Sequence, residues 1–266
     1  MGLREIYTNP PLALTVVELR HPASGPLQDA DQAALKMLLN SDFPLFKPVR
    51  HMTLTVNVLP SPSSQEQTHA ATPRYMNRDR TAAITFRPDA IAIETTSYQR
   101  RSALRAILRQ AVQARQKVAP VDGVERLGIR YINEVRAPVD GPADWAQWIT
   151  PALAGLTGLG DNRGGVQSWQ GMAVFGTPLT GTVLRYGNFE GHAVDPSGEL
   201  RRAFTPPPGP FYLMDLDNYW TPEDNTPPLE WDLVEPRFDE AALSAYTLFQ
   251  ELITDRYRQE VLHRAQ

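Results

Sequence analysis

The order of the predicted strands and helices is the feature that most restricts the fold of this chain. Short β-branched or alternating segments predict strands at residues 12–20, 50–59, 80–86, 90–95 and 124–135. Helical spacing of apolar residues predicts helices at 28–40 and 98–118 between them. Because the resulting order, β-α-β-β-β-α-β, lacks regular βαβ alternation, we expect an α+β protein with an antiparallel sheet covered on one face.

The second half of the chain is expected to repeat this arrangement after a turn-rich hexapeptide at residues 137–142. The elements predicted there are helices at 144–156 and 238–263 and strands at 166–175, 182–190 and 211–219. Residues 60–77, rich in Ser, Pro, Gln and Thr, predict a mobile loop. The sequence therefore predicts two packed halves, 1–137 and 143–266, each an antiparallel sheet with a long covering helix, or one continuous domain.

Composition excludes several classes of protein. The 266 residues include 42% hydrophobic and 21% charged residues, proportions that favour a folded globular chain over a disordered one. Cysteine is absent, which excludes disulfides, thiolate metal sites and a cysteine nucleophile. No apolar run approaches the ~18 residues of a spanning helix, and no signal-peptide pattern opens the chain. We therefore expect a cytoplasmic protein without membrane contact.

Charge is distributed unevenly along the chain. The formal net charge of −4 argues against nucleic acid as the main partner. Lys and Arg outnumber Asp and Glu between residues 74 and 136, whereas acids dominate after residue 211. The simplest interpretation is that these two regions face each other or only solvate the surface.

Arg130 is a candidate functional residue because it interrupts an apolar predicted strand. A charge in such a strand must reach solvent or an anionic partner, since an unpaired buried charge is very costly. We expect a salt bridge to an acid such as Glu18, and an anion-binding pocket is the alternative. Tyr131 and Asn133 fall on the opposite face of the same strand.

Asp215 and Asp217 form a candidate acidic pair. Their spacing of two on a predicted strand points both carboxylates to one face. Such a pair suits Mg²⁺ binding or acid–base chemistry, with Arg185 close in sequence. The competing interpretation is a solvent-facing row on an antiparallel strand.

The predicted helix at 98–118 carries a basic stripe along about a third of its circumference. Its members are Arg101, Arg105, Arg109 and Arg115. Because Tyr98 is the one aromatic side chain nearby, nucleic-acid binding is disfavoured. A solvated face or a docking surface for an acidic protein remains.

Metal and cofactor signatures are missing from the sequence. The five histidines, His21, His51, His69, His192 and His263, show no pairing at metal-ligand spacing. Residues 161–165 lack the spacing of a phosphate loop. We therefore expect no metal and no cofactor.

Five segments distributed nearly from end to end carry a resemblance to a known family. They are Pro10-Pro11-Leu12 leading into residues 16–20, and residues 90–98, 127–133, 214–217 and 249–255. Leu-Gly-Ile-Arg-Tyr-Ile-Asn at 127–133 is the most specific of them, and 249–255 supplies the Phe-x-x-x-Ile-Thr-Asp pattern. In these segments the chain resembles a sporadically distributed bacterial family of proteins of unknown function. The resemblance implies a common fold of about this length and assigns no chemistry.

Two hypotheses of function follow. The leading one is a non-enzymatic binding protein, an antitoxin-like, immunity-like or regulatory partner of another protein, because long polar loops accompany 24 prolines and no catalytic motif. The alternative is a phosphate- or nucleotide-handling enzyme whose cations bind phosphate. Its pocket would be lined by Glu18, Arg130, Arg185, Asp215 and Asp217.

Overall fold

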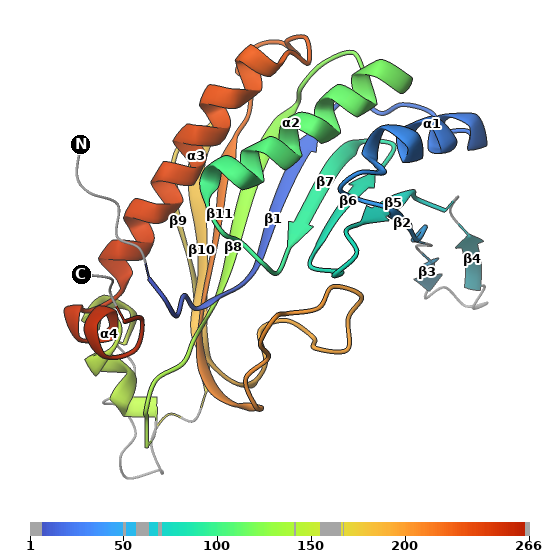
Figure 1. The fold of residues 1–266 in the computed structure, drawn as a ribbon. Helices are drawn as coiled ribbons and strands as arrows, with labels where there is room; N and C mark the ends of the chain where they lie inside the picture. The colour runs from blue at the N-terminus through green and yellow to red at the C-terminus, as the bar shows by residue number, and fades with distance from the viewer. Residues whose placement is uncertain are drawn as a thin grey trace.

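A nine-stranded antiparallel sheet forms the centre of the part of the chain that the structure describes (Figure 1). The computed structural model describes residues 7–49, 52–56, 64–68, 71–140, 142–154, 166 and 168–263. The sheet order is β2-β5-β6-β7-β1-β8-β11-β10-β9. Its strands are β1 (Leu12–Arg20), β2 (Leu45–Phe46), β5 (Arg74–Met76), β6 (Ala82–Phe86), β7 (Ala90–Thr95), β8 (Arg126–Val135), β9 (Trp169–Gly176), β10 (Thr180–Gly191) and β11 (Gly209–Trp220).

The two expected halves share this one sheet. β8, the last strand of the first half, pairs along its length with β11, so that Tyr212 lies opposite Val135 and Trp220 opposite Leu127. β1 lies near the middle, between β7 and β8. The α+β class is therefore confirmed, with one continuous sheet in place of two.

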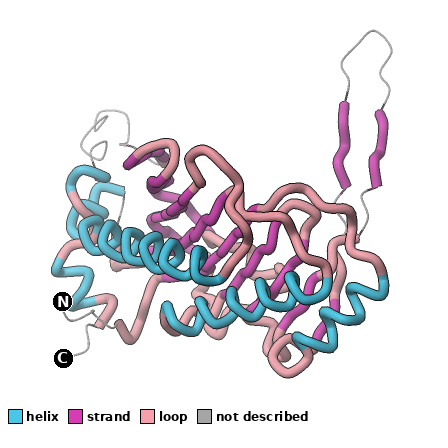
Figure 2. The backbone as a smooth tube through the Cα atoms, turned by 90° about the horizontal axis from the view of Figure 1, so that it is seen from above, coloured by secondary structure: helices cyan, strands magenta, loops and turns pink. Residues whose placement is uncertain are grey.

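The three long helices cover one face of the sheet (Figures 1 and 2). They are α1 (Asp29–Leu39), α2 (Arg101–Val118) and α3 (Trp231–Leu252). Beneath them lie two apolar clusters. The larger packs β1, β6, β7, α1 and α2 together, and the smaller gathers around β11 and the end of α3.

The helix predicted at 238–263 is divided in the structure. α3 begins earlier, at Trp231, and includes Pro236. It ends at Leu252 because Ile253 is extended and forms a β-bridge with Ile149. Thr254 then caps a separate short helix, α4 (Asp255–Glu260), by accepting a hydrogen bond from the Tyr257 amide.

Other predicted elements also differ in extent. The helix predicted at 144–156 is replaced by two short 3-10 helices, η1 (Pro142–Gln147) and η2 (Pro151–Leu153), because Ile149 turns extended to pair with Ile253. The predicted loop at 60–77 includes two strands, β4 (Ser64–Thr68) and β5. β4 pairs with β3 (Met52–Val56), which lies within the strand predicted at 50–59. None of the described helices combines the length and the apolarity needed to cross a membrane.

The second face of the sheet carries charged side chains joined in ion pairs. We call it the ion-paired face. Its members include Glu18, Arg74, Glu94, Arg126, Arg130, Glu134, Arg185, Asp215 and Asp217. The connection between β10 and β11 crosses part of this face, where Arg202 pairs with Glu134 and Glu199 with Lys47.

A candidate ligand-binding cavity

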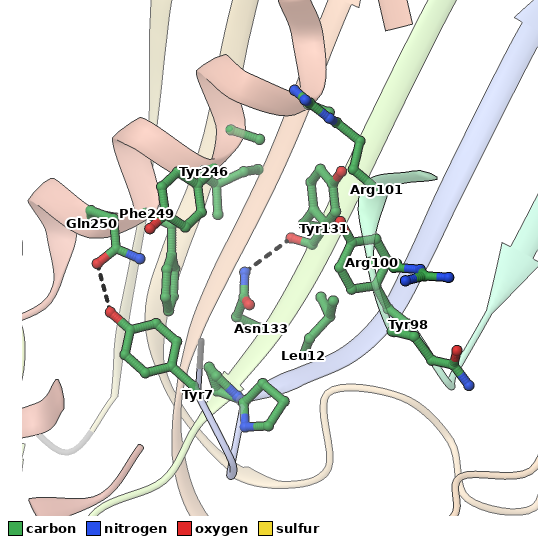
Figure 3. A pocket seen from close by; sticks show the side chains of 16 residues that line it. Tyr7, Leu12, Tyr98, Arg100, Arg101, Tyr131, Asn133, Tyr246, Phe249 and Gln250 are labelled. Atoms are coloured by element: carbon green, nitrogen blue, oxygen red, sulfur yellow. Dashed lines mark hydrogen bonds between the residues drawn. The ribbon is translucent and has the colours of Figure 1, made fainter. Parts of the chain in front are cut away.

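A cavity of about 460 Å³ lies between the sheet and α3, on the helix-covered face (Figure 3). It is bounded by β1, β8 and β11 below, α3 on one side and the segment leading into α2 on the other. Its described lining residues are mainly apolar and aromatic. They are Tyr7, Pro10, Pro11, Leu12, Tyr98, Gln99, Arg100, Arg101, Tyr131, Asn133, Leu216, Ala242, Ala245, Tyr246, Phe249 and Gln250.

The hollow exists because α3 presents small side chains where it passes over the sheet. Ala242 and Ala245 are both buried and face the cavity, and Tyr246 and Phe249 follow them on the same face of the helix. The alanine side chains at these two positions are single methyl groups, and they leave space that leucine side chains would fill. The cavity therefore exists because α3 carries alanine at these positions.

Aromatic rings stand on opposite walls of the cavity. The rings of Tyr98 and Tyr131 meet edge to face, with their centroids 5.8 Å apart. Phe249 and Tyr246 lie across from them in Figure 3. Rings arranged in this way present flat apolar surfaces, which suit contact with another ring.

The N-terminal strap, residues 7–11, closes one end of the cavity. The Tyr7 hydroxyl donates to Gln250 Oε1 at 2.7 Å, and Asn9 bonds through its backbone and side chain to residues that follow α4. Arg258 Nε also donates to Gln250 Oε1, at 3.2 Å. The Gln250 amide is therefore oriented, and its Nε2 is buried without a hydrogen-bond partner in the described part of the chain.

Two arginines stand at the opposite end, where α2 begins. Arg100 is exposed and forms no ion pair with the described residues, whereas Arg101 Nε lies 3.3 Å from Asp239 Oδ1 on α3. The first turn of α2 has no acidic residue and no side-chain cap. Because a helix start carries positive partial charge, the local field at this end favours an anionic group.

Arg130 is paired with a carboxylate, as expected, but the partner is Asp215 and not Glu18. Arg130 Nε and Nη2 donate to Asp215 Oδ1 and Oδ2 at 2.7 and 2.6 Å. Arg185 Nη1 lies 3.6 Å from Asp215 Oδ2. Asp215 is only 2% exposed. The hydrogen bond with Asp215 raises the pKa of Arg130.

Glu18 has other partners. Burial opposes its ionisation, but hydrogen bonds from Arg20 and Arg87 outweigh that effect and hold its pKa below the usual value. Asp217 forms an ion pair with Arg126, whose Nη2 lies 3.4 Å from the Asp217 carboxylate. Asp215 and Asp217 are therefore neither a free solvent-facing row nor an open acid–base pair, because each carboxylate forms ion pairs with arginine side chains.

Part of the basic stripe of α2 faces acids on α3. Arg115 does not, because it is buried and its Nη2 donates to Ser24 Oγ at 2.9 Å, so that it does not belong to a solvated face. Arg105 Nη1 lies 2.6 Å from Asp239 Oδ2 and 3.0 Å from Glu235 Oε1. The Arg109 guanidinium stacks over the Trp231 ring at 5.6 Å. The basic middle and the acidic end of the chain therefore meet across this helix pair, as the charge distribution suggested.

The candidate residues predicted from the sequence lie in three places, one of which is the contact between α2 and α3 that holds Arg105 and Arg109. Arg101, Tyr131 and Asn133 line the cavity, whereas the arginines and aspartates of β8, β10 and β11 lie on the ion-paired face. Sequence reasoning missed the residues contributed by the N-terminal strap and α3. The segments that carry the predicted family resemblance include only part of this lining, namely Pro10, Pro11, Phe249 and Gln250, and no signal pointed to Tyr7, Ala242, Ala245 and Tyr246.

A scan against models of protein families found no match to this chain, and a search of curated proteins found no similar sequence. The resemblance to a sporadically distributed bacterial family therefore stays a prediction. Among the described residues, no group of three or more His, Asp or Glu side chains is arranged to hold a metal ion.

Proposed function

We propose that this chain is a binding protein whose ligand is a small molecule with an apolar, ring-bearing body and an anionic end. The observation that carries the proposal is the cavity of about 460 Å³ between the sheet and α3. This volume lies within the range of roughly 300–1,000 Å³ that is typical of small-molecule sites.

The lining residues favour the apolar body. Tyr98, Tyr131 and Phe249 offer ring surfaces, and the floor from Leu216 is apolar. Among them stand a few polar groups, as in most small-molecule sites. The buried Gln250 Nε2 is a donor that a ligand oxygen would satisfy, and a buried donor without a partner is costly.

Charge favours the anionic end. The described lining residues include two arginines and no Asp or Glu. Arg101 is engaged by Asp239, which leaves Arg100 as the cation at the rim. A carboxylate, sulfonate or phosphate at this end would meet both the Arg100 guanidinium and the start of α2.

The phosphate-handling alternative has less support. Its arginines and carboxylates exist, but the bidentate contact between Arg130 and Asp215 joins them to each other. An antitoxin-like, immunity-like or regulatory role remains a prediction that co-purification with a partner protein would test. A ligand-binding protein is compatible with such a role, because a bound ligand shifts the equilibrium between conformations that bind it unequally.

A pair of dyes of matched size tests the proposal. We expect 1-anilinonaphthalene-8-sulfonate to bind the folded wild-type protein at one site, and its uncharged parent N-phenyl-1-naphthylamine to bind there more weakly. Ala245→Phe should fill the cavity and weaken both dyes at least about tenfold, which corresponds to ~1.4 kcal/mol. Leu243→Phe, at an exposed position on the same helix, should change neither.

The role of the rim is tested separately. Arg100→Ala should weaken the sulfonate dye about fivefold and leave the uncharged dye unchanged, since only the anion meets the guanidinium. Arg78→Ala removes another exposed arginine and serves as the control. Equal binding of both dyes to wild type and to Ala245→Phe, with unchanged melting temperatures, would contradict a ligand site in this cavity.

A further inference from the structure

β9 forms one outer edge of the sheet and is much longer than β2, the strand at the other edge. The eight residues of β9 pair with β10 on the inner side, and no described residue pairs with its outer side. The strand at the other end of the sheet, β2, has only two residues. A long open edge presents a row of backbone donors and acceptors to any strand that approaches it.

The composition of β9 does not protect this edge. No Asp, Glu, Lys or Arg occurs anywhere between residues 164 and 184, and β9 contains no proline. The ladder between β9 and β10 runs without a register shift, so that no bulge turns the edge away. Natural proteins usually blunt long edges with charges, prolines or bulges, all of which are absent here.

The exposed side chains of β9 are apolar. Met172 is 65% exposed, Val174 61% and Phe175 46%. Met172 and Val174 lie on the ion-paired side of the sheet, opposite Arg185 and Val183 of β10, and Phe175 lies on the helix-covered side, opposite Thr182. Apolar surface therefore lines both faces of the edge.

We propose that the edge is the contact between two copies of this chain, joined by antiparallel pairing of β9 with β9. A two-fold axis perpendicular to the sheet generates such a pair and keeps the helices of both copies on the same face. Residues directly opposite in an antiparallel ladder share a face, so the axis must pass through a residue and not between two residues. Ala173, between Met172 and Val174, is the central choice.

This register makes the edge complementary to itself. With the axis at Ala173, Met172 of each copy lies opposite Val174 of the other, so that the two most exposed apolar side chains of β9 cover each other. Phe175 of each copy lies opposite Gly171 of the other, where the Tyr186 ring is its neighbour. The absence of charge removes the repulsion that would oppose pairing of identical strands.

Sedimentation equilibrium of the full-length chain tests the proposal. Wild type should sediment as a species of twice the chain mass. Met172→Lys with Val174→Lys should shift it to a monomer, because each lysine then faces a lysine of the other copy. Met172→Lys with Val174→Glu should restore the dimer through two cross-strand Lys–Glu pairs. Leu243→Lys, at an exposed position on α3 and not on β9, should leave the dimer intact.

Each outcome decides the matter. The substituted side chains are exposed, so the double-lysine variant should keep the circular dichroism spectrum of wild type and a cooperative melting transition. The Lys–Glu variant provides a second folded comparison. A wild-type monomer at every concentration would overturn the proposal, including when that monomer pairs with an added extended peptide. A dimer that persists in the double-lysine variant would place the contact elsewhere and would overturn it equally.

Discussion

The two faces of the sheet are stabilised by different physics. On the helix-covered face, apolar side chains such as Val17 and Ile129 are completely buried, and stability follows from the area removed from water. On the ion-paired face, arginines and carboxylates hold one another in ion pairs with N–O distances of 2.5 to 3.9 Å. The comparison teaches why the cavity lies where it does: a hollow among apolar residues remains open, whereas the charged face has paired its binding groups with each other.

Removal of a core ring should have the largest effect on stability. Phe238 on α3 is fully buried in the larger apolar cluster. Phe238→Ala should lower the free energy of unfolding by about 3–5 kcal/mol, because it removes apolar contacts and leaves a void. Urea denaturation measures the change. Leu243→Ala, exposed on the same helix, is the control and should stay within about 0.5 kcal/mol of wild type. Similar losses in the two variants would contradict the assignment of the core to this face.

Removal of one ion-pair partner should have an intermediate effect. Arg130→Ala leaves Asp215 buried with only the more distant Arg185. Because Arg130 itself is 43% exposed, we expect a loss of about 1–2 kcal/mol, below the 3–5 of a fully buried pair. Arg130→Lys should restore part of it, since lysine cannot make the bidentate contact.

The same denaturation series includes Arg78→Ala, an exposed arginine, as its control. An increase in stability in Arg130→Ala would instead indicate a strained arginine kept for binding an anion.

Acid should lower the stability that the ion pairs of Glu134 contribute, by less than the loss expected for Arg130→Ala. Burial opposes ionisation of Glu134, but Arg136, the Ala193 amide and Arg202 together lower its pKa below 4.5. Since the folded pKa lies below the unfolded value, Glu134 stabilises the fold fully above about pH 4.5, and this contribution is lost as the pH falls through the folded pKa.

Melting curves of wild type and Glu134→Gln across this range provide the measurement. The difference between them should be constant at neutral pH and shrink in acid. A difference that grew as the pH fell would reverse the sign and refute the assigned pairing.

Local patterns predicted most strands, because alternation and β-branching are properties of a few consecutive residues. The strand predicted at 12–20 agrees with β1 in both bounds. Choice of partner is a property of the whole chain and was not predictable in this way. Arg130 lies directly opposite Asp217 in the ladder, yet it reaches diagonally to Asp215, a choice that depends on Arg126 occupying Asp217.

The cavity itself lay beyond sequence reasoning for a similar reason. Tyr131 and Asn133 were identifiable as polar residues on one strand face, but the ceiling above them comes from Ala245 and its neighbours on α3. Nothing local in α3 distinguishes an alanine that packs against the sheet from one that leaves a hollow. Only the placement of the helix decides between them.

The N-terminal strap has a consequence for the order of events during synthesis. Tyr7 lies against Gln250, so that the cavity is closed by residues from the first and last described parts of the chain, which also lie close together in Figure 1. The early strands can pair while the chain is still being made, but the wall from α3 is absent until residues 231–252 have been synthesised and have folded. The cavity is therefore complete only after the first and the last described parts of the chain have come together.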